Sequence, residues 1–174
     1  MINFILPTAE NKDDVLSFYS EFEKADETCI GYGNYKNFDE WLTGMNNRRT
    51  GTNLPKGYVR ENFYLCYADT ELIGVFSLKF ELTDFLLNYG GHIGYAVRPS
   101  KRNCGLATEI LRQGLIISEQ FGFKRILCIC DEDNVASKKV ILKNGGIFEN
   151  RIYDPHDNVF VKRYWITVKN AQTR

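Results

Sequence analysis

The order of hydrophobic periods after residue 90 restricts the fold of this chain more than any other feature. Residues 92–97 have the apolar content of a strand, and residues 105–121 then carry apolar side chains on one face at helical spacing. Residues 126–130 are uninterrupted apolar sequence, typical of a strand covered on both faces, and a second amphipathic helix is predicted over 134–143. A strand, a helix and a strand in succession predict a parallel pair inside the sheet.

Antiparallel strands are predicted on both sides of this segment. Strand-like runs cover residues 63–68, 72–82, 147–152 and 159–168, and helical spacing covers 8–24 and 38–47. The first two runs are joined by residues 69–71, which have the length and chemistry of a hairpin connection, and they should pair with 92–97. The expected fold class is therefore α/β or α+β, with a mixed, mainly antiparallel sheet and helices on both faces.

Length and charge exclude several classes of protein. The 174 residues fit one domain, 1–174, whose core is large enough to need no metal or disulfide. Because 22 Lys and Arg balance 22 Asp and Glu, no broad basic surface for nucleic acid is expected. No run approaches the ~18 apolar residues of a membrane span. The five cysteines are an odd number, which favours free thiols in a reducing, cytoplasmic location.

The segment from Val97 to Thr108 is predicted to bind an anion. A strand ends there, a short loop with three basic side chains follows, and Gly105 opens the long helix. Such a turn directs unpaired backbone N–H groups and the positive end of the helix dipole to one point. Gly105 and Ala107 leave room for a ligand oxygen near the backbone. The segment has neither a P-loop ending nor a G-x-G-x-x-G pattern, and a plain strand-to-helix turn with solvated arginines is the alternative.

This segment resembles the acyl-coenzyme A signature of the GNAT N-acetyltransferase superfamily, (Gln or Arg)-x-x-Gly-x-(Gly or Ala). The matching residues are Arg102-x-x-Gly105-x-Ala107, preceded by Val97-x-Pro99 at the strand end. The resemblance continues through Asn134-Val135-Ala136-Ser137 and Asn144-Gly145-Gly146-Ile147-Phe148-Glu149. It covers about residues 63–168, and the first sixty residues fit only as two helices. The combined pattern is specific, whereas each part alone is weak.

The resemblance implies a sheet that is splayed in its middle, with acetyl-CoA in the cleft between residues 92–97 and 126–130. The backbone of Ala96 and Val97 would pair with the pantetheine arm. The pyrophosphate would lie on the backbone of the next loop, which comprises Arg102, Asn103, Cys104, Gly105, Leu106, Ala107 and Thr108. Asn134 would contact the pantetheine from the far side, and Lys143 would either reach a phosphate or be a solvated cation at its helix end. Residues 63–168 would form the cofactor-binding core and 1–60 the acceptor side.

Acetyl transfer to an amine needs a base, because an amine with a pKa near ~10 is mostly protonated at neutral pH. His92 is the first candidate, since it begins the cofactor-side strand and an imidazole titrates near ~6.5. Its other interpretation is a strand-end histidine hydrogen-bonded to a neighbouring loop. Glu81 and Asp131 are the alternative bases.

The proton donor to the leaving thiolate is a second open question. Many members of the superfamily use a tyrosine seven residues after the asparagine, and that position is Ile141 here. Tyr95, Tyr153 or Tyr164 would have to replace it, or the thiolate would leave through water. Tyr153 completes the expected catalytic set with His92 and Glu81.

No metal site is expected from the cysteines. Cys128 and Cys130 share one strand face, but their spacing lacks the Cys pairs of structural zinc. Buried free cysteine packs as a small apolar residue, and a thiol-redox protein using this pair is a further hypothesis. On the acceptor side, an aromatic group with flanking carboxylates suits either a cationic amine or an aromatic core, and it comprises Tyr32, Tyr35 and Phe38 with Asp26, Glu27, Asp39 and Glu40.

The function expected from the sequence is direct transfer of the acetyl group of acetyl-CoA to a primary amine of a small molecule or peptide. The alternative from another class is a noncatalytic acyl-CoA-binding or sensor domain, suggested by the missing tyrosine. Neither metal, nucleic acid nor membrane is an expected partner. The chain could self-associate as a homodimer through a sheet edge or its first helices, although no motif specifies this.

Overall fold

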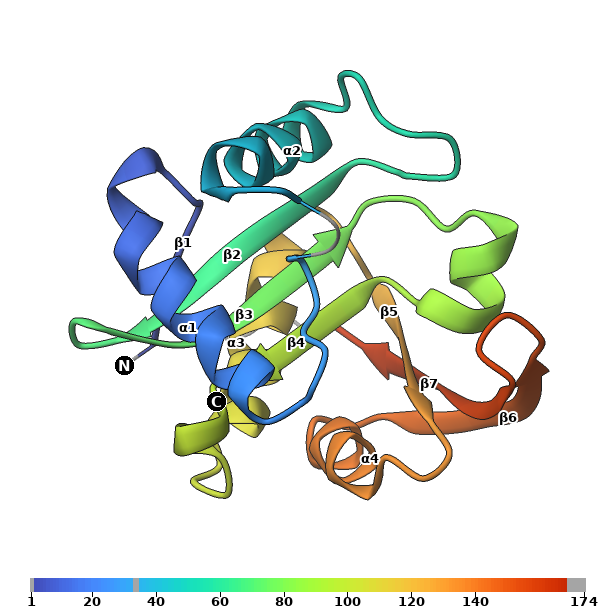
Figure 1. The fold of residues 1–174 in the computed structure, drawn as a ribbon. Coiled ribbons are helices and arrows are strands. Elements are labelled where there is room, and N and C mark those ends of the chain that lie inside the picture. Colours follow the sequence, from blue (N-terminus) through green and yellow to red (C-terminus); the bar gives the residue numbers. More distant parts are fainter. Residues whose placement is uncertain (1, 33–34, 169–174) are drawn as a thin grey trace.

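The computed structural model describes residues 2–32 and 35–168, and its strands form two sheets (Figure 1). The first sheet has the order β1-β2-β3-β4 and the second the order β5-β7-β6, and each hydrogen-bonded pair is antiparallel. The first sheet consists of β1 (Ile2–Ile5), β2 (Glu61–Ala68), β3 (Glu71–Lys79) and β4 (Ile93–Val97). The second sheet consists of β5 (Arg125–Asp131), β6 (Ile147–Asp154) and β7 (Val159–Thr167).

Helices cover both faces of the first sheet (Figure 1). α1 (Lys12–Lys24) and α2 (Phe38–Thr50) pack on β3 and β2 from one side, and α3 (Leu106–Gln120) packs on β3 and β4 from the other. α4 (Val135–Lys143) packs against α3 and β5. Within the described ranges, no helix has the length and hydropathy that crossing a bilayer requires.

Side-chain alternation along the strands divides the core into two clusters. Val75 of β3 packs in the cluster beneath α1 and α2 with Phe18 and Trp41, whereas the next residue, Phe76, packs beneath α3 with Ile110. All five side chains are fully buried. The same alternation places Tyr95 of β4 against the α3 cluster and Ala96 against the α1–α2 cluster, so β4 presents residues to both sides of the molecule.

Most of the predicted elements are confirmed, including the hairpin from β2 to β3 and the antiparallel pairing of β3 with β4. The first helix begins at Lys12 rather than at residue 8, because a 3-10 turn over Ala9–Asn11 (η1) precedes it. The second helix extends three residues past its predicted end at residue 47, to Thr50, and Gly51 ends it in the left-handed conformation.

Two elements have no counterpart in the sequence-based prediction. β1 is only four residues long, and it is ordered by pairing with β2, so that Ile5 lies opposite Leu65. A π-helix over Leu86–Gly90 (η2) connects β3 to β4. Neither is visible in a local hydrophobic pattern, because a short edge strand depends on a distant partner and a π-turn has no characteristic period.

β4 and β5 lie beside each other only at their beginnings. The His92 N–H donates to the Leu127 carbonyl at 2.9 Å, and the Leu127 N–H donates to Nδ1 of His92 at 2.9 Å. In the part of the chain that the structure describes, no backbone hydrogen bond joins β4 to β5 beyond this point. The predicted parallel pair is therefore absent as a ladder. At the one point where the strands meet, the His92 imidazole takes the N–H that a strand carbonyl would accept. The expected α+β fold with a sheet opened in its middle is confirmed.

Candidate functional site

The loop after β4 leaves a row of backbone donors without acceptors. A 3-10 turn over Pro99–Lys101 (η3) is followed by Asn103 and Gly105, whose φ angles of 64° and 78° are left-handed. The first backbone bond of α3 is donated by Glu109 to the Gly105 carbonyl at 3.2 Å. Among the described residues, the N–H groups of residues 103–108 have no backbone or side-chain acceptor. They are therefore available to an anion at the positive end of the α3 dipole.

Open space lies over these donors. A Cβ built on Gly105 would meet no atom within 4 Å, and residues 102–105 are exposed. A side chain at residue 105 would extend into this space and would have to adopt a left-handed backbone. The loop therefore depends on glycine for its conformation as well as for access.

The basic side chains of the loop all form ion pairs, and those of Lys101 and Arg102 remain partly exposed. Arg102 binds Glu27 through two hydrogen bonds of 2.8 and 2.6 Å, and its guanidinium lies 5.4 Å from the Phe22 ring centre. The hydrogen bond from Arg102 lowers the pKa of Glu27. The other two cations pair similarly, Arg98 with Glu21 and Glu71 and Lys101 with Glu71. Arg102 thus connects the loop to the end of α1, and anion binding falls mainly to the main chain.

The first turn of α4 faces the cofactor side of β4. Asn134 is the N-cap, and its side-chain oxygen accepts a 2.9 Å hydrogen bond from the Ser137 N–H. The hydroxyls of Tyr95 and Ser137 lie 2.9 Å apart, which connects β4 to α4. Burial raises the pKa of Tyr95, so this hydroxyl keeps its proton at neutral pH. The structure therefore brings together Asn134 and Tyr95, two of the residues singled out in the sequence, and adds Ser137.

The end of α4 contacts the start of α3. The Asn144 side-chain amide donates to the Thr108 carbonyl at 3.2 Å. The preceding residue, Lys143, is exposed. Lys143 is thus one residue from a direct contact with the donor row, which leaves both interpretations of this lysine open.

His92 has the surroundings of a structural residue. It is 8% exposed, and its ring packs edge-on against Phe123 and Trp165, with centre-to-centre distances of 5.4 and 6.2 Å. Burial, with a smaller contribution from the charge of Lys79, lowers its pKa to about 4. Nδ1 already accepts the Leu127 N–H. This geometry argues against His92 as the general base. It fits the other interpretation, a hydrogen-bonded histidine at a strand end, except that its partner is Leu127 of strand β5 rather than a loop.

The other candidate bases are carboxylates at strand ends. Glu81 is exposed two residues after the end of β3. Asp131 ends β5, on the face opposite the buried Cys128 and Cys130. Partial desolvation raises the pKa of Asp131, and the neighbouring charges of Asp133, Asp157 and Asp154 add to the increase. A carboxylate with a raised pKa accepts a proton from an ammonium group more readily.

The remaining tyrosine candidates are less suited to donate a proton, one because its hydroxyl is engaged elsewhere and the other because it is buried. Tyr153 is 46% exposed on β6, where its hydroxyl bonds Asn158 and its ring packs on Phe160. Tyr164 and Ile141 are each 1% exposed in the α3 cluster. The position of the usual tyrosine is therefore filled by a buried aliphatic residue.

All five cysteines are free. Cys128 and Cys130 are buried, and burial raises the pKa of the Cys128 thiol to about 12. A thiol this reluctant to ionise is a poor redox nucleophile. Within the described ranges, no group of three His, Cys, Asp or Glu side chains is arranged to hold a metal ion.

The predicted acceptor-side carboxylates have other contacts. Glu27 is paired with Arg102, and Glu40 accepts the Lys36 N–H at 2.8 Å. Asp26 and Asp39 are exposed. The carboxylates that flank the aromatic residues therefore do not gather around an amine pocket.

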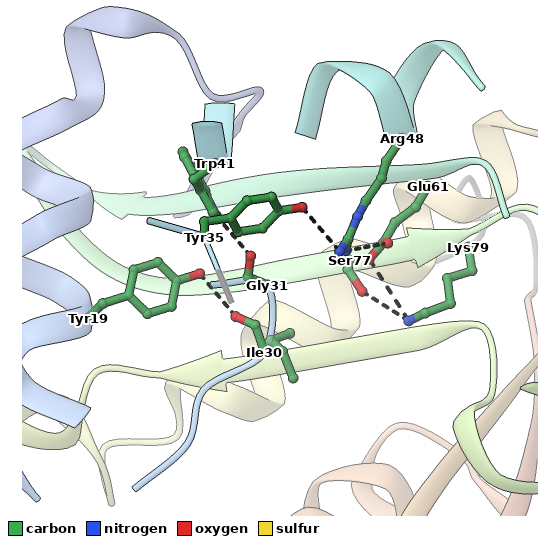
Figure 2. A network of polar contacts seen from close by, with 9 residues as sticks. All are labelled: Tyr19, Ile30, Gly31, Tyr35, Trp41, Arg48, Glu61, Ser77 and Lys79. Atoms are coloured by element: carbon green, nitrogen blue, oxygen red, sulfur yellow. Dashed lines mark hydrogen bonds and ion pairs between the residues drawn. The ribbon is translucent and has the colours of Figure 1, made fainter. Parts of the chain in front are cut away.

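A buried polar network on this side was missed by the sequence analysis (Figure 2). It joins Arg48 of α2 to Glu61 and Lys79, which lie opposite each other in the β2–β3 pair. The sequence did contain a clue to this network. Glu61 precedes the first apolar run of the hairpin and Lys79 follows the apolar residues of the second, and the register of a hairpin brings these two outer ends together.

Comparison with known proteins identifies the family. The sequence matches the family model "Acetyltransferase (GNAT) domain" over residues 3–147. A Salmonella typhimurium acetyltransferase that modifies the N-terminal serine of ribosomal protein L7/L12 is 17% identical, with 97% of this chain and 95% of that chain covered and a TM-score of 0.70. The microcin C7 self-immunity acetyltransferase, solved with acetyl-CoA and AMP, is 17% identical, with 96% and 92% covered and a TM-score of 0.70.

An N-acetyltransferase from Staphylococcus aureus is 14% identical, with 97% of this chain and 99% of that chain covered and a TM-score of 0.66. No curated protein matches the sequence significantly. At these identities the solved structures establish the fold, and the family match establishes the membership that the loop motif suggested. Proteins of this family use acetyl-CoA. The chain belongs to the GNAT acetyltransferase family and is an acyltransferase of that family.

Proposed function

We propose that this protein transfers the acetyl group of acetyl-CoA directly to a primary amine of a small molecule or peptide. The observation that carries the proposal is the row of free N–H groups of residues 103–108, next to the opening between β4 and β5. A diphosphate fits these donors because they converge at a helix N-terminus and no side chain covers them.

The free edge of β4 supports the same proposal. β4 ends its sheet, so Ala96 and Val97 have no strand partner on the side of β5 among the described residues. Their backbone groups would pair with the pantetheine amides, and Asn134 would contact the arm from α4. When bound, acetyl-CoA supplies the thioester that the amine attacks. Lys143, together with the loop from Arg102 to Thr108, would hold the phosphates.

Proton transfers are assigned to groups on the two faces of the cleft. The Tyr95 and Ser137 hydroxyls are the proposed donors to the leaving thiolate, because they meet at the start of α4. Asp131 is the proposed base, ahead of Glu81, because its raised pKa suits proton transfer. His92 and Tyr153 are placed lower in this proposal, since one is buried with Nδ1 occupied and the other bonds Asn158 on β6.

The whole chain, 1–174, is proposed to act as one unit, although residues 1 and 169–174 lie outside the described residues. Residues 1–60 would shape the acceptor side and 63–168 the cofactor side. A cytoplasmic location is proposed on the basis of the five free thiols.

Substitution of Gly105 tests cofactor binding. Gly105→Asp puts a carboxylate where a phosphate must lie, so coenzyme A should bind about a hundredfold more weakly, or ~2.7 kcal/mol. Gly122→Asp is the matched control, because Gly122 is also left-handed, has no neighbour within 4 Å of its Cβ position and lies at the opposite end of α3. Isothermal titration with coenzyme A should separate the two variants, and equal affinities would contradict the proposal.

A noncatalytic acyl-CoA sensor is the second candidate. The observation that favours it is Ile141, which is buried at the position of the usual proton donor. Thiol release from acetyl-CoA, measured with a panel of primary amines, distinguishes the two candidates. Tight binding of acetyl-CoA without turnover on any amine would favour the sensor, whereas acceptor-dependent thiol release would exclude it.

A further inference from the structure

The network of Arg48, Glu61 and Lys79 contains one more positive than negative charge (Figure 2). Glu61 lies 3.1 Å from Nη1 of Arg48 and 3.9 Å from Nζ of Lys79, so one carboxylate is shared by two cations. The other polar and ring contacts of the two cations among the described residues are with uncharged groups. The Tyr35 hydroxyl lies 3.4 Å from Arg48 and the Ser77 hydroxyl 3.4 Å from Lys79, and the Arg48 guanidinium lies 4.8 Å from the centre of the Tyr58 ring. With both cations protonated, one positive charge therefore has no counter-charge among residues 2–32 and 35–168.

This excess charge lies in a largely desolvated place. The exposed fractions of the three charged side chains are 15% for Arg48, 7% for Glu61 and 22% for Lys79. An unpaired charge removed from water is unfavourable unless a counter-charge joins it, and burial, together with the charge of Arg48, accordingly lowers the pKa of Lys79 although Glu61 opposes the shift. The network is consequently one anion short of neutrality, and the partial exposure of Lys79 gives that anion a route to it.

The network adjoins the acetyl-transfer side of β4. Ser77 pairs with Gly94 in the β3–β4 ladder, and a Cβ on Gly94 would lie 3.2 Å from the Ser77 hydroxyl. The same position would contact Ile30, whose carbonyl accepts a 3.0 Å hydrogen bond from Tyr19. The next residue, Gly31, accepts a 2.8 Å hydrogen bond from the Trp41 ring N–H, so that Ile30 and Gly31 are held between Tyr19 and Trp41 (Figure 2). Gly94 thus lets β4 pack closely against both Ser77 of the network and Ile30.

We infer that Lys79, supported by Arg48, binds an anionic group, a carboxylate or a phosphate, on the acetyl acceptor. This inference rests on the proposed acetyl transfer and specifies its substrate class, an amine that carries an anion. Gly94 is two residues from Ala96, about 7 Å along a strand. The acceptor is therefore a short molecule, or a short terminal group of a larger one, with its amine and anion separated by roughly this distance.

The test compares matched acceptors that differ only in the anion. β-Alanine is paired with β-alaninamide, and phosphoethanolamine with ethanolamine, in assays of kcat/KM for acetyl transfer. Lys79→Met should reduce the preference for the anionic member at least tenfold, and Lys79→Arg should retain it. Arg49→Met, which removes an exposed cation from α2, is the control for net charge. Because each preference is compared between variants, the intrinsic reactivity of each amine cancels.

A binding measurement separates this inference from the proposed activity. The unfolding temperature of the CoA-saturated protein is measured with rising β-alanine, β-alaninamide and inorganic phosphate. The anionic probes should stabilise the wild type and Arg49→Met but not Lys79→Met. If no anion stabilises the wild type, or if Lys79→Met responds equally, the inference is wrong even when coenzyme A binds normally. Failure of coenzyme A to bind would instead overturn the proposed function.

Discussion

Protonation of His92 should weaken the fold in acid, and the effect can be worked out from its surroundings. The pKa of this imidazole is lowered from 6.5 to about 4, first by burial and then by the charge of Lys79. The folded state therefore holds the neutral ring, while the unfolded chain binds a proton below pH 6.5. Stability from this residue is complete above the unfolded pKa and is lost as pH falls from about 6.5 to about 4.

The size of the loss follows from the same pKa values. At 1.36 kcal/mol for each tenfold change in proton affinity, the full loss is about 3 kcal/mol, of which about 2 kcal/mol is reached at pH 5. Only 8% of the residue is exposed, so solvent screens a charge on the ring weakly, and about 3 kcal/mol is the upper end of the expected loss. A proton on Nδ1 would also break the 2.9 Å hydrogen bond from Leu127 that joins the two sheets.

His92→Asn isolates this effect. The asparagine oxygen takes a place close to that of Nδ1 and can accept the Leu127 N–H, but it does not titrate. Loss of ring packing against Phe123 and Trp165 should make the variant less stable than the wild type at pH 7.5. At pH 5 the difference should shrink by about 2 kcal/mol, because only the wild type pays the protonation penalty.

Urea unfolding followed by tryptophan fluorescence at pH 7.5, 6 and 5 measures this difference. His156→Asn, which removes the exposed histidine of the β6–β7 turn, controls for loss of an imidazole. Other titrating groups are common to all three proteins and cancel in the comparison. A difference between wild type and His92→Asn that does not change with pH would refute the argument that the buried ring is neutral. It would also restore His92 as a candidate base.

Two further substitutions test the packing and the chemistry. Gly114→Ala should destabilise the protein by about 1–3 kcal/mol, because a Cβ there would overlap the Phe76 ring where α3 approaches β3, and urea unfolding with an unchanged midpoint would contradict this close contact. Ser137→Ala should lower kcat for acetyl transfer about tenfold or more, because it removes the hydroxyl that meets Tyr95. The affinity for coenzyme A should stay within threefold, because the Asn134 cap bonds only the backbone N–H of residue 137, which the variant keeps. Steady-state kinetics beside calorimetry would show whether both parameters instead fall together.

Local sequence was sufficient for the cofactor half of the protein. The order of strand and helix periods after residue 90 predicted β4, α3, β5 and α4, since these elements bury continuous apolar faces. Gly105 and its loop likewise predicted the donor row, because a strand-to-helix turn that lacks side-chain caps leaves its first N–H groups free whatever surrounds it. These features depend on residues that are close together in the chain.

The candidate chemistry depended on distant contacts that no local pattern contains. His92 was a reasonable base by sequence, but Leu127, Phe123 and Trp165 bury it and occupy its Nδ1. Arg102 was expected beside a phosphate, but it bonds Glu27 from another segment. In both cases the pKa or the orientation of an ionisable group is determined by charges and burial from elsewhere in the fold.

Sequence alone thus determined which segments fold into strands and helices and where backbone donors are left over, because both follow from neighbouring residues. Tertiary structure alone decided which charged side chains meet. The register of β2 with β3 places Glu61 opposite Lys79, and α2 adds Arg48 from a separate segment. Electrostatic energy depends on distance and solvent access in space rather than on separation along the chain, so the excess charge beside β4 becomes visible only in the folded molecule.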